Sequence, residues 1–219
     1  MALFTLMHNP ILVTRPKHDL VTRYLCAWCE EFVNEVRSKG IDVYDLEGTK
    51  ATKSKFENYI KAHNPSFLFL NGHGDSATIT GHDNKTLVDS NTTLSSATVL
   101  YARSCDAGQI LGPHLVKKGL CAFIGYKRKF ILGYIPDKIW SPLKDPIAQL
   151  FLESSNLVPS TLVKGHTVEE AHVRSRTQMY SNFRKMVSSA ATYEERYAAR
   201  WLWSNLNNQV FFGNPMSTI

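Results

Sequence analysis

Residues 67–75 read FLFLNGHGD, and residues 98–108 read TVLYARSCDAG. Each stretch opens with a short apolar run, typical of a strand buried on both faces of a parallel sheet, and continues into small and polar residues. In open parallel sheets, the loops at the carboxyl ends of the strands face one shared crevice. If these two strands are neighbours, His73 and Cys105 face each other across that crevice.

The pattern around these stretches predicts an α/β fold with a mostly parallel central sheet flanked by helices. Strand-like runs alternate with helix-like spacing, which favours right-handed crossovers between parallel strands. Residues 76–90 are expected to form a hairpin. With no internal repeat and no long linker, the chain is predicted to be a single domain, 1–219. The expected strands are 10–14, 41–44, 67–70, 98–102 and 121–124, and the expected helices are 19–38, 53–62, 109–118, 145–155, 167–187 and 192–208.

The composition is that of an ordinary globular protein. Hydrophobic residues make up 43% of the 219 residues and charged residues 20%, which argues against disorder. Four cysteines do not form a disulfide framework of the secreted kind, so we expect free thiols in a reducing compartment. Residues 1–13 lack the features of a signal peptide, and the longest apolar stretch, 119–135, is interrupted by three basic residues. We therefore expect a soluble, cytoplasmic protein without a membrane segment.

A cysteine beside a histidine is the machinery of acyl transfer. The imidazolium, together with a following helix N-terminus, favours the thiolate, which is the nucleophile. Gly72 and Gly74 let the backbone approach a substrate closely, and the amides of Gly74 and Cys105 are placed to hold an oxyanion. The plainer alternative is that the Gly-His-Gly segment is only a turn and that Cys105 is a small packing residue. The two motifs in this order, each at a strand end, favour catalysis.

The same two segments resemble the His-Gly and Cys motifs of the caspase-fold cysteine peptidases, and within them the CHAT and gingipain-like members. Residues 112–126, GPHLVKKGLCAFIGY, are similar to the helix and next strand of those members, and FGNP at 212–215 is similar to their Gly-Asp-Pro element. The resemblance implies a caspase-like three-layer sandwich. It also implies a cysteine endopeptidase in which His73 is the general base and acid and Cys105 is the nucleophile that forms a thioester acyl-enzyme, with the Gly74 and Cys105 amides as the oxyanion hole.

The chain departs from the caspase pattern in three places. His73 and Cys105 are 32 residues apart, fewer than the roughly 50 of caspases, so we expect the helix between hairpin and nucleophile strand to be trimmed. Ser104 stands where alanine is usual. Asp106 is unlike the arginine of caspases and closer to the glutamate of many CHAT domains.

In this fold, the residue two before the nucleophile and a residue after the first strand line the pocket for the side chain that precedes the scissile bond. These positions hold Arg103 and, after the first strand, Arg15 and Lys17. Such cations would bind an acidic side chain, so we expect cleavage after Asp or Glu. Asp75 and Asp106 are further candidates for substrate contact. The alternative is that Arg103 points into solvent or pairs with one of these two carboxylates.

We expect no metal and no cofactor. The spacing of Cys26 and Cys29 is typical of a metal-binding pair, but the two residues share one face of an amphipathic helix and have no second pair of ligands nearby. His166 and His172 are six residues apart and do not share a helical face.

Two other function classes remain open. Lys127, Arg128 and Lys129 lie between Tyr126 and Phe130, a mixture that can bind phosphates and stack bases, although a net charge of +6 is modest for nucleic-acid binding. We prefer this segment as a contact for substrate or activator. The other class is a catalytically silent scaffold.

The resemblance also bears on partners and control. Members of the family are usually latent until a partner or ligand orders the groove, and residues 125–146 are the candidate mobile loop. The expected partners are a protein substrate and a regulatory or sensor protein, as in some microbial defence systems, and direct binding of nucleic acid is not expected.

Overall fold

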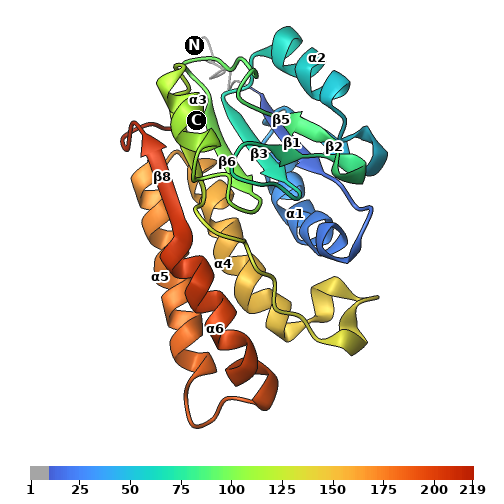
Figure 1. Ribbon diagram of the computed structural model, residues 1–219, viewed down its shortest axis with the longest axis vertical. Helices are drawn as coiled ribbons and strands as arrows, with labels where there is room; N and C mark the ends of the chain where they lie inside the picture. Colours follow the sequence, from blue (N-terminus) through green and yellow to red (C-terminus); the bar gives the residue numbers. More distant parts are fainter. Residues whose placement is uncertain (1–9) are drawn as a thin grey trace, which may run out of the picture.

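The computed structural model describes residues 10–219 (Figure 1). Residues 1–9, which contain most of the segment examined above for a signal peptide, lie outside the described residues. No helix in the described part of the chain is long and apolar enough to cross a membrane.

A six-stranded sheet forms the centre of the fold, in the order β2-β1-β3-β6-β7-β8. The first five strands in this order are parallel, and β8 runs antiparallel to β7. The mostly parallel α/β sheet expected from the sequence is therefore confirmed. The strands are β1 (Ile11–Arg15), β2 (Val43–Glu47), β3 (Phe67–Asn71), β6 (Val99–Arg103), β7 (Ala122–Tyr126) and β8 (Gln209–Gly213).

Helices cover both faces of this sheet, as Figure 1 shows. Side chains on a strand point alternately to opposite faces, and β3 uses both: Phe67 and Phe69 pack into one core, Leu68 and Leu70 into the other. All four are fully buried, which explains why the strand has no polar alternation. The first core is covered by α1 (Leu20–Ser38), α4 (Pro146–Leu162), α5 (Val168–Met186) and α6 (Tyr193–Asn208), the second by α2 (Lys53–His63) and α3 (Leu111–Lys117).

Helix ends follow their capping residues. Asp19 caps α1 and Thr167 and Thr192 cap α5 and α6, each in a reciprocal capping box, which confirms the predicted starts. The predicted end of α4 at residue 155 is wrong, because the helix continues to Leu162 through an internal proline, Pro159.

The predicted hairpin is confirmed. It consists of β4 (Ile79–Thr80) and β5 (Thr86–Val88), joined by a 3-10 turn at His82–Asn84. Asp83 and Asn84 have positive φ angles of 54° and 57°, which short polar side chains tolerate. Among the described residues, no helix separates this hairpin from β6, so the connection is as short as the spacing of His73 and Cys105 indicated.

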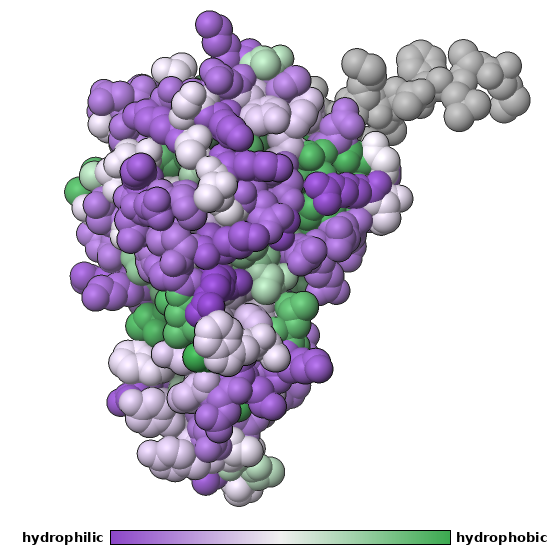
Figure 2. All heavy atoms as spheres, turned by 90° about the vertical axis from the view of Figure 1, so that its right-hand side faces the viewer, coloured by the Kyte–Doolittle hydropathy of each residue, from purple (hydrophilic) through white to green (hydrophobic). Residues whose placement is uncertain are grey.

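The segment expected to be a mobile loop is held at both ends. Asp145 is buried and accepts hydrogen bonds from the Tyr24 hydroxyl and the Ile135 amide, and the Asn205 side chain bonds both backbone groups of Ile131. Between these anchors the segment carries exposed apolar side chains, and such side chains break the hydrophilic surface in the lower half of the face shown in Figure 2. The large exposed ones in this segment are Tyr134, Trp140 and Leu143.

Candidate active site

The two predicted motifs leave the same edge of the sheet. β3 and β6 are parallel neighbours, with Asn71 opposite Arg103. The loops then stay together: a Cβ added at Gly74 would lie 3.2 Å from the Ser104 Cβ and 2.7 Å from the Thr78 carbonyl oxygen. Only glycine fits so close an approach. The loops that carry His73 and Cys105 are thus neighbours.

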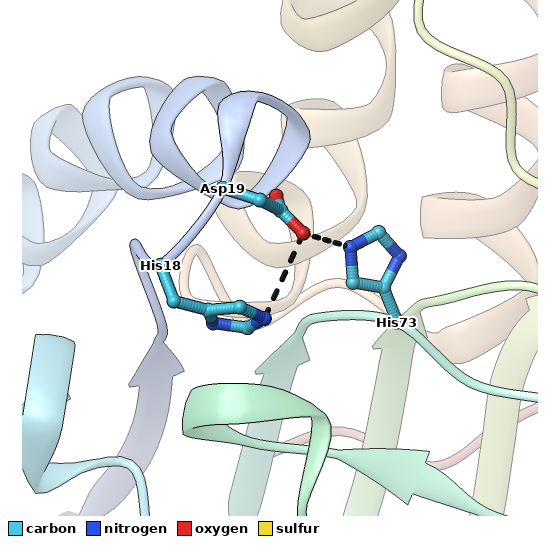
Figure 3. Close-up of side chains that lie close together, drawn as sticks. All are labelled: His18, Asp19 and His73. Atoms are coloured by element: carbon cyan, nitrogen blue, oxygen red, sulfur yellow. Dashed lines mark hydrogen bonds and ion pairs between the residues drawn. The ribbon is translucent and has the colours of Figure 1, made fainter.

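His73 is bonded to a carboxylate that the sequence prediction did not include. Its Nε2 lies 2.6 Å from Oδ2 of Asp19, the N-cap residue of α1 (Figure 3). In the sheet order β1-β3-β6, β3 is the middle strand. The loop after β3, which holds His73, therefore lies between the loop after β1, which holds Asp19, and the loop after β6, which holds Cys105. In Figure 3 the second ring nitrogen of His73, Nδ1, points away from Asp19.

The Asp19 carboxylate is ionised at neutral pH. Burial opposes its charge, but hydrogen bonds from Thr22 and His73 outweigh burial and lower its pKa below the ordinary value. An ionised carboxylate at Nε2 favours the imidazole tautomer that carries its proton there. Nδ1 is then the basic nitrogen of His73.

Two backbone donors are free at the predicted oxyanion hole. The amides of Gly74 and Cys105 make no hydrogen bond to any of residues 10–219. Neither amide is therefore occupied within the described residues, as an oxyanion hole requires.

Cys105 is in a resting environment. Its Sγ lies 3.8 Å from the Phe130 carbonyl oxygen, and within residues 10–219 no hydrogen bond joins it to His73. Burial raises the pKa of the thiol and outweighs the backbone hydrogen bond at Phe130, which lowers it, and Asp106 raises it further. The helix expected to favour the thiolate begins only at Leu111, six residues further on. The thiol is therefore protonated at neutral pH in this conformation.

Arg103 lies where no substrate can reach it. Its side chain is 0% exposed and follows Tyr101 into the core beneath the sheet, because alternate residues of a strand share a face. It donates to Asn71 Oδ1 at 2.7 Å, Asn156 Oδ1 at 2.7 Å, Ser155 Oγ at 3.1 Å and the Leu25 carbonyl at 3.2 Å. The guanidinium neither reaches solvent nor pairs with a carboxylate, so both earlier interpretations of Arg103 are wrong.

The other predicted cations are neutralised. Arg15 is buried and makes two hydrogen bonds to Asp45, at 2.9 and 2.5 Å, and Lys17 pairs with Glu47 at 2.8 Å. Both carboxylates belong to β2, which lies beside β1. An acidic substrate side chain would have to displace them.

The two predicted carboxylates near the motifs shape their own loops. Asp75 accepts from the amides of Ala77 and Thr78, and Asp106 accepts from the Gln109 side chain. Asp106 also has a positive φ of 57°, which turns the chain sharply after Cys105. Their described contacts are local ones.

The basic run at 127–129 is exposed, but the aromatic residues on either side of it, Tyr126 and Phe130, are buried. They cannot stack on bases in this structure, which removes the feature that favoured nucleic-acid binding. Cys26 and Cys29 are buried in the core, as expected.

Sequence reasoning missed His18, Asp19 and His82. The signal was available for the first two, because they follow β1 by only a few residues and the same rule about strand ends places them in the crevice. The ring centroid of His18 lies 6.1 Å from that of His73 and 5.4 Å from that of His82, which the hairpin brings in.

Comparison with protein-family models found no family that matches the chain, and comparison with curated proteins found no match either.

Proposed function

We propose that this chain is a cysteine endopeptidase of the caspase-like fold, with Cys105 as nucleophile, His73 as general base and acid, and Asp19 as the carboxylate that orients His73. The observation that carries the proposal is the place of His73. One ring nitrogen of His73 bonds Asp19 at 2.6 Å, and in the sheet order the loop of Cys105 follows the strand on the opposite side of β3 from Asp19.

The reaction follows from these positions. Nδ1 of His73 takes the proton of the Cys105 thiol, and the sulfur attacks the carbonyl carbon of the scissile peptide bond. The Gly74 and Cys105 amides bind the resulting oxyanion. The C–N bond then breaks, His73 returns its proton to the leaving amine, and the thioester remains. Water, deprotonated by His73, hydrolyses the thioester and restores the thiol.

The resting thiol supports a latent enzyme. Burial raises the pKa of Cys105 and so disfavours the thiolate, and the thiol is directed at the Phe130 carbonyl rather than at His73. Phe130 belongs to the segment that carries Tyr134, Trp140 and Leu143 on its surface, and a regulatory protein that binds these side chains would move the carbonyl from the sulfur.

The test is digestion of a proteome-derived peptide library by the purified chain, with cut sites identified by mass spectrometry. Specific cuts support the proposal and define the residue preference, which the burial of Arg103 leaves open. A library that stays uncut would overturn the peptidase and favour a silent scaffold.

The alkylation profile of the resting chain is itself predictable. Because burial raises the pKa of Cys105, its rate of reaction with iodoacetamide should reach half-maximum at a higher pH than that of a cysteine in an unstructured peptide. Stopped alkylation and peptide mapping across a pH series measure this midpoint. A midpoint below that of the peptide would contradict the resting state described here.

Replacing Asp19 by asparagine should lower kcat by about 10²-fold or more and leave KM nearly unchanged, since the carboxylate orients the base and touches no substrate. Asparagine caps helices as well as aspartate does, so α1 should keep its stability. Steady-state kinetics measure the split, and ¹⁵N NMR of the imidazole should show the proton leaving Nε2. Asp42→Asn, at an exposed position, is the matched control. An equal loss in both variants would argue against the orienting role.

A further inference from the structure

We propose that His18, Asp19 and His73 form a binding site for a divalent transition-metal ion, with Zn²⁺ as the best fit, and that the bound ion blocks the base of the active site. The consequence for activity rests on the proposed function, whereas the binding does not. One ligand atom from each residue lies within 4.8 Å of the other two. Figure 3 shows the two imidazoles turned toward the same carboxylate oxygen.

The spacing suits a tetrahedral ion. Asp19 Oδ2 lies 2.6 Å from His73 Nε2 and 3.6 Å from His18 Nε2. Ligand atoms at Zn–N and Zn–O distances of about 2.0–2.1 Å lie about 3.3 Å apart in a tetrahedron, between the two observed values. Small side-chain rotations therefore bring the Asp19 oxygen to a tetrahedral spacing from each imidazole, and the ion would replace the 3.2 Å contact of His18 Nε2 with Asn84 Oδ1.

The donor set selects the kind of metal. Two neutral imidazoles and one carboxylate are common ligands of zinc, whereas Mg²⁺ and Ca²⁺ take mostly oxygen. The side chains of His73 and Asp19 are 36% and 37% exposed, so the ion has a way in and the fourth position stays open to water.

Further contacts hold the side chains of Asp19 and His18 in place. Oδ1 of Asp19 accepts from the Thr22 amide at 2.8 Å and from the Thr22 hydroxyl at 2.9 Å, which leaves Oδ2 for the imidazoles. The side chain of His18 is only 11% exposed and packs between the rings of His73 and His82. Two of the three ligands are thus held in place before an ion arrives, which lowers the entropy lost on binding.

The effect on catalysis follows from imidazole chemistry. When Nε2 of His73 binds the metal, the neutral ring carries its proton on Nδ1. Nδ1 can then accept no proton from Cys105. Metal binding should therefore inhibit the enzyme reversibly, without a bond to the thiol.

The binding test uses the full chain freed of metal and titrated with Co²⁺, whose visible absorption reports tetrahedral coordination, followed by displacement with Zn²⁺. We expect one ion per chain and an affinity at least 10-fold weaker in His18→Gln. His82→Gln is the matched control and should bind as the wild type does. Binding that is lost in His82→Gln would place the ion on the neighbouring group of His18, His82 and Asp83 and overturn the proposal. A cobalt–thiolate band that disappears in Cys105→Ala would overturn it as well.

The activity arm separates the two proposals. Zn²⁺ should inhibit cleavage and a chelator restore it, and in His18→Gln, which keeps Asp19 and His73, the zinc concentration that halves the variant's own rate should rise at least 10-fold. If no peptide is cut and Co²⁺ binding still depends on His18, the proposed function fails and the metal site stands. If peptides are cut and His18→Gln binds metal as the wild type does, the metal site fails alone.

Discussion

Replacing Cys105 by alanine is expected to abolish cleavage at every site of the peptide library, with a fall in kcat of at least about 10⁴-fold. In the proposed mechanism the sulfur forms the covalent bond to the substrate, and alanine has no nucleophilic atom to replace it. The side chain is partly buried, and within residues 10–219 its sulfur makes one weak hydrogen bond, to the Phe130 carbonyl. The variant should therefore unfold at nearly the same denaturant concentration as the wild type.

Cys121→Ala is the matched control for this substitution. Cys121 is also partly buried, and its Sγ lies 2.9 Å from the Ser217 hydroxyl, away from the crevice. Initial rates on the best-cut peptides and urea unfolding curves for both variants give the comparison. Cleavage that survives in Cys105→Ala, or is lost equally in Cys121→Ala, would mean that Cys105 is not the nucleophile.

The sequence identified the five parallel strands of the sheet, because the signal is strong where burial is complete, but it missed β8, whose residues are mostly only half-buried. The runs 67–70 and 99–102 consist of fully buried hydrophobic residues on both faces, which is typical of a central strand. The proximity of the two motif loops also follows from the sequence, once β3 and β6 are taken as neighbours. The ends of helices without a cap signal, such as α4, are less predictable.

Asp19 shows what a local reading omits. The sequence predicted a helix that starts at Asp19, and the structure confirms this, since Oδ1 of Asp19 caps α1. Its second oxygen bonds His73, 54 residues further along the chain. The capping pattern accounts for Oδ1 of Asp19. The partner of Oδ2 is set by the tertiary structure, which the periodicity of the sequence does not predict.

The predicted cationic pocket failed for a related reason. Arg15 lies beside Glu47 in the register of β1 and β2, and its guanidinium also meets Asp45. These partners come from a strand about 30 residues away. Because burial of an unpaired charge is unfavourable, a buried arginine finds such partners when the sheet forms. The charge of a residue type alone did not show whether it is free to bind a substrate.

Replacing Arg103 by methionine should destabilise the chain by about 3–5 kcal/mol, although methionine fits the volume and removes a buried charge. Exchange of a buried ionic group for an apolar one is often neutral when all its partners are exchanged with it. Here the partners remain: two amide oxygens, a hydroxyl and a backbone carbonyl lose the guanidinium as donor, although Asn156 is only half-buried and the Ser155 hydroxyl keeps its bond to the Leu152 carbonyl. A buried acceptor left without any donor costs about 1–3 kcal/mol.

Lysine should not rescue the position, because one ammonium cannot reach acceptors on β3, α1 and α4 at once, whereas the planar fork of arginine does. Urea unfolding measures the change, with exposed Arg174→Met as a control that should stay within about 0.5 kcal/mol. A methionine variant as stable as the wild type would show that the four acceptors find other partners.

The activity of a folded Arg103→Met variant tests one further step. Asn71, which holds the Nε of Arg103, directly precedes Gly72 and His73, so the buried arginine also fixes the end of β3 from which the base emerges. Below the denaturation midpoint, kcat should fall while Arg174→Met retains its full rate. Such a result would mean that Arg103, although it does not reach the substrate, affects catalysis by fixing the backbone that carries His73.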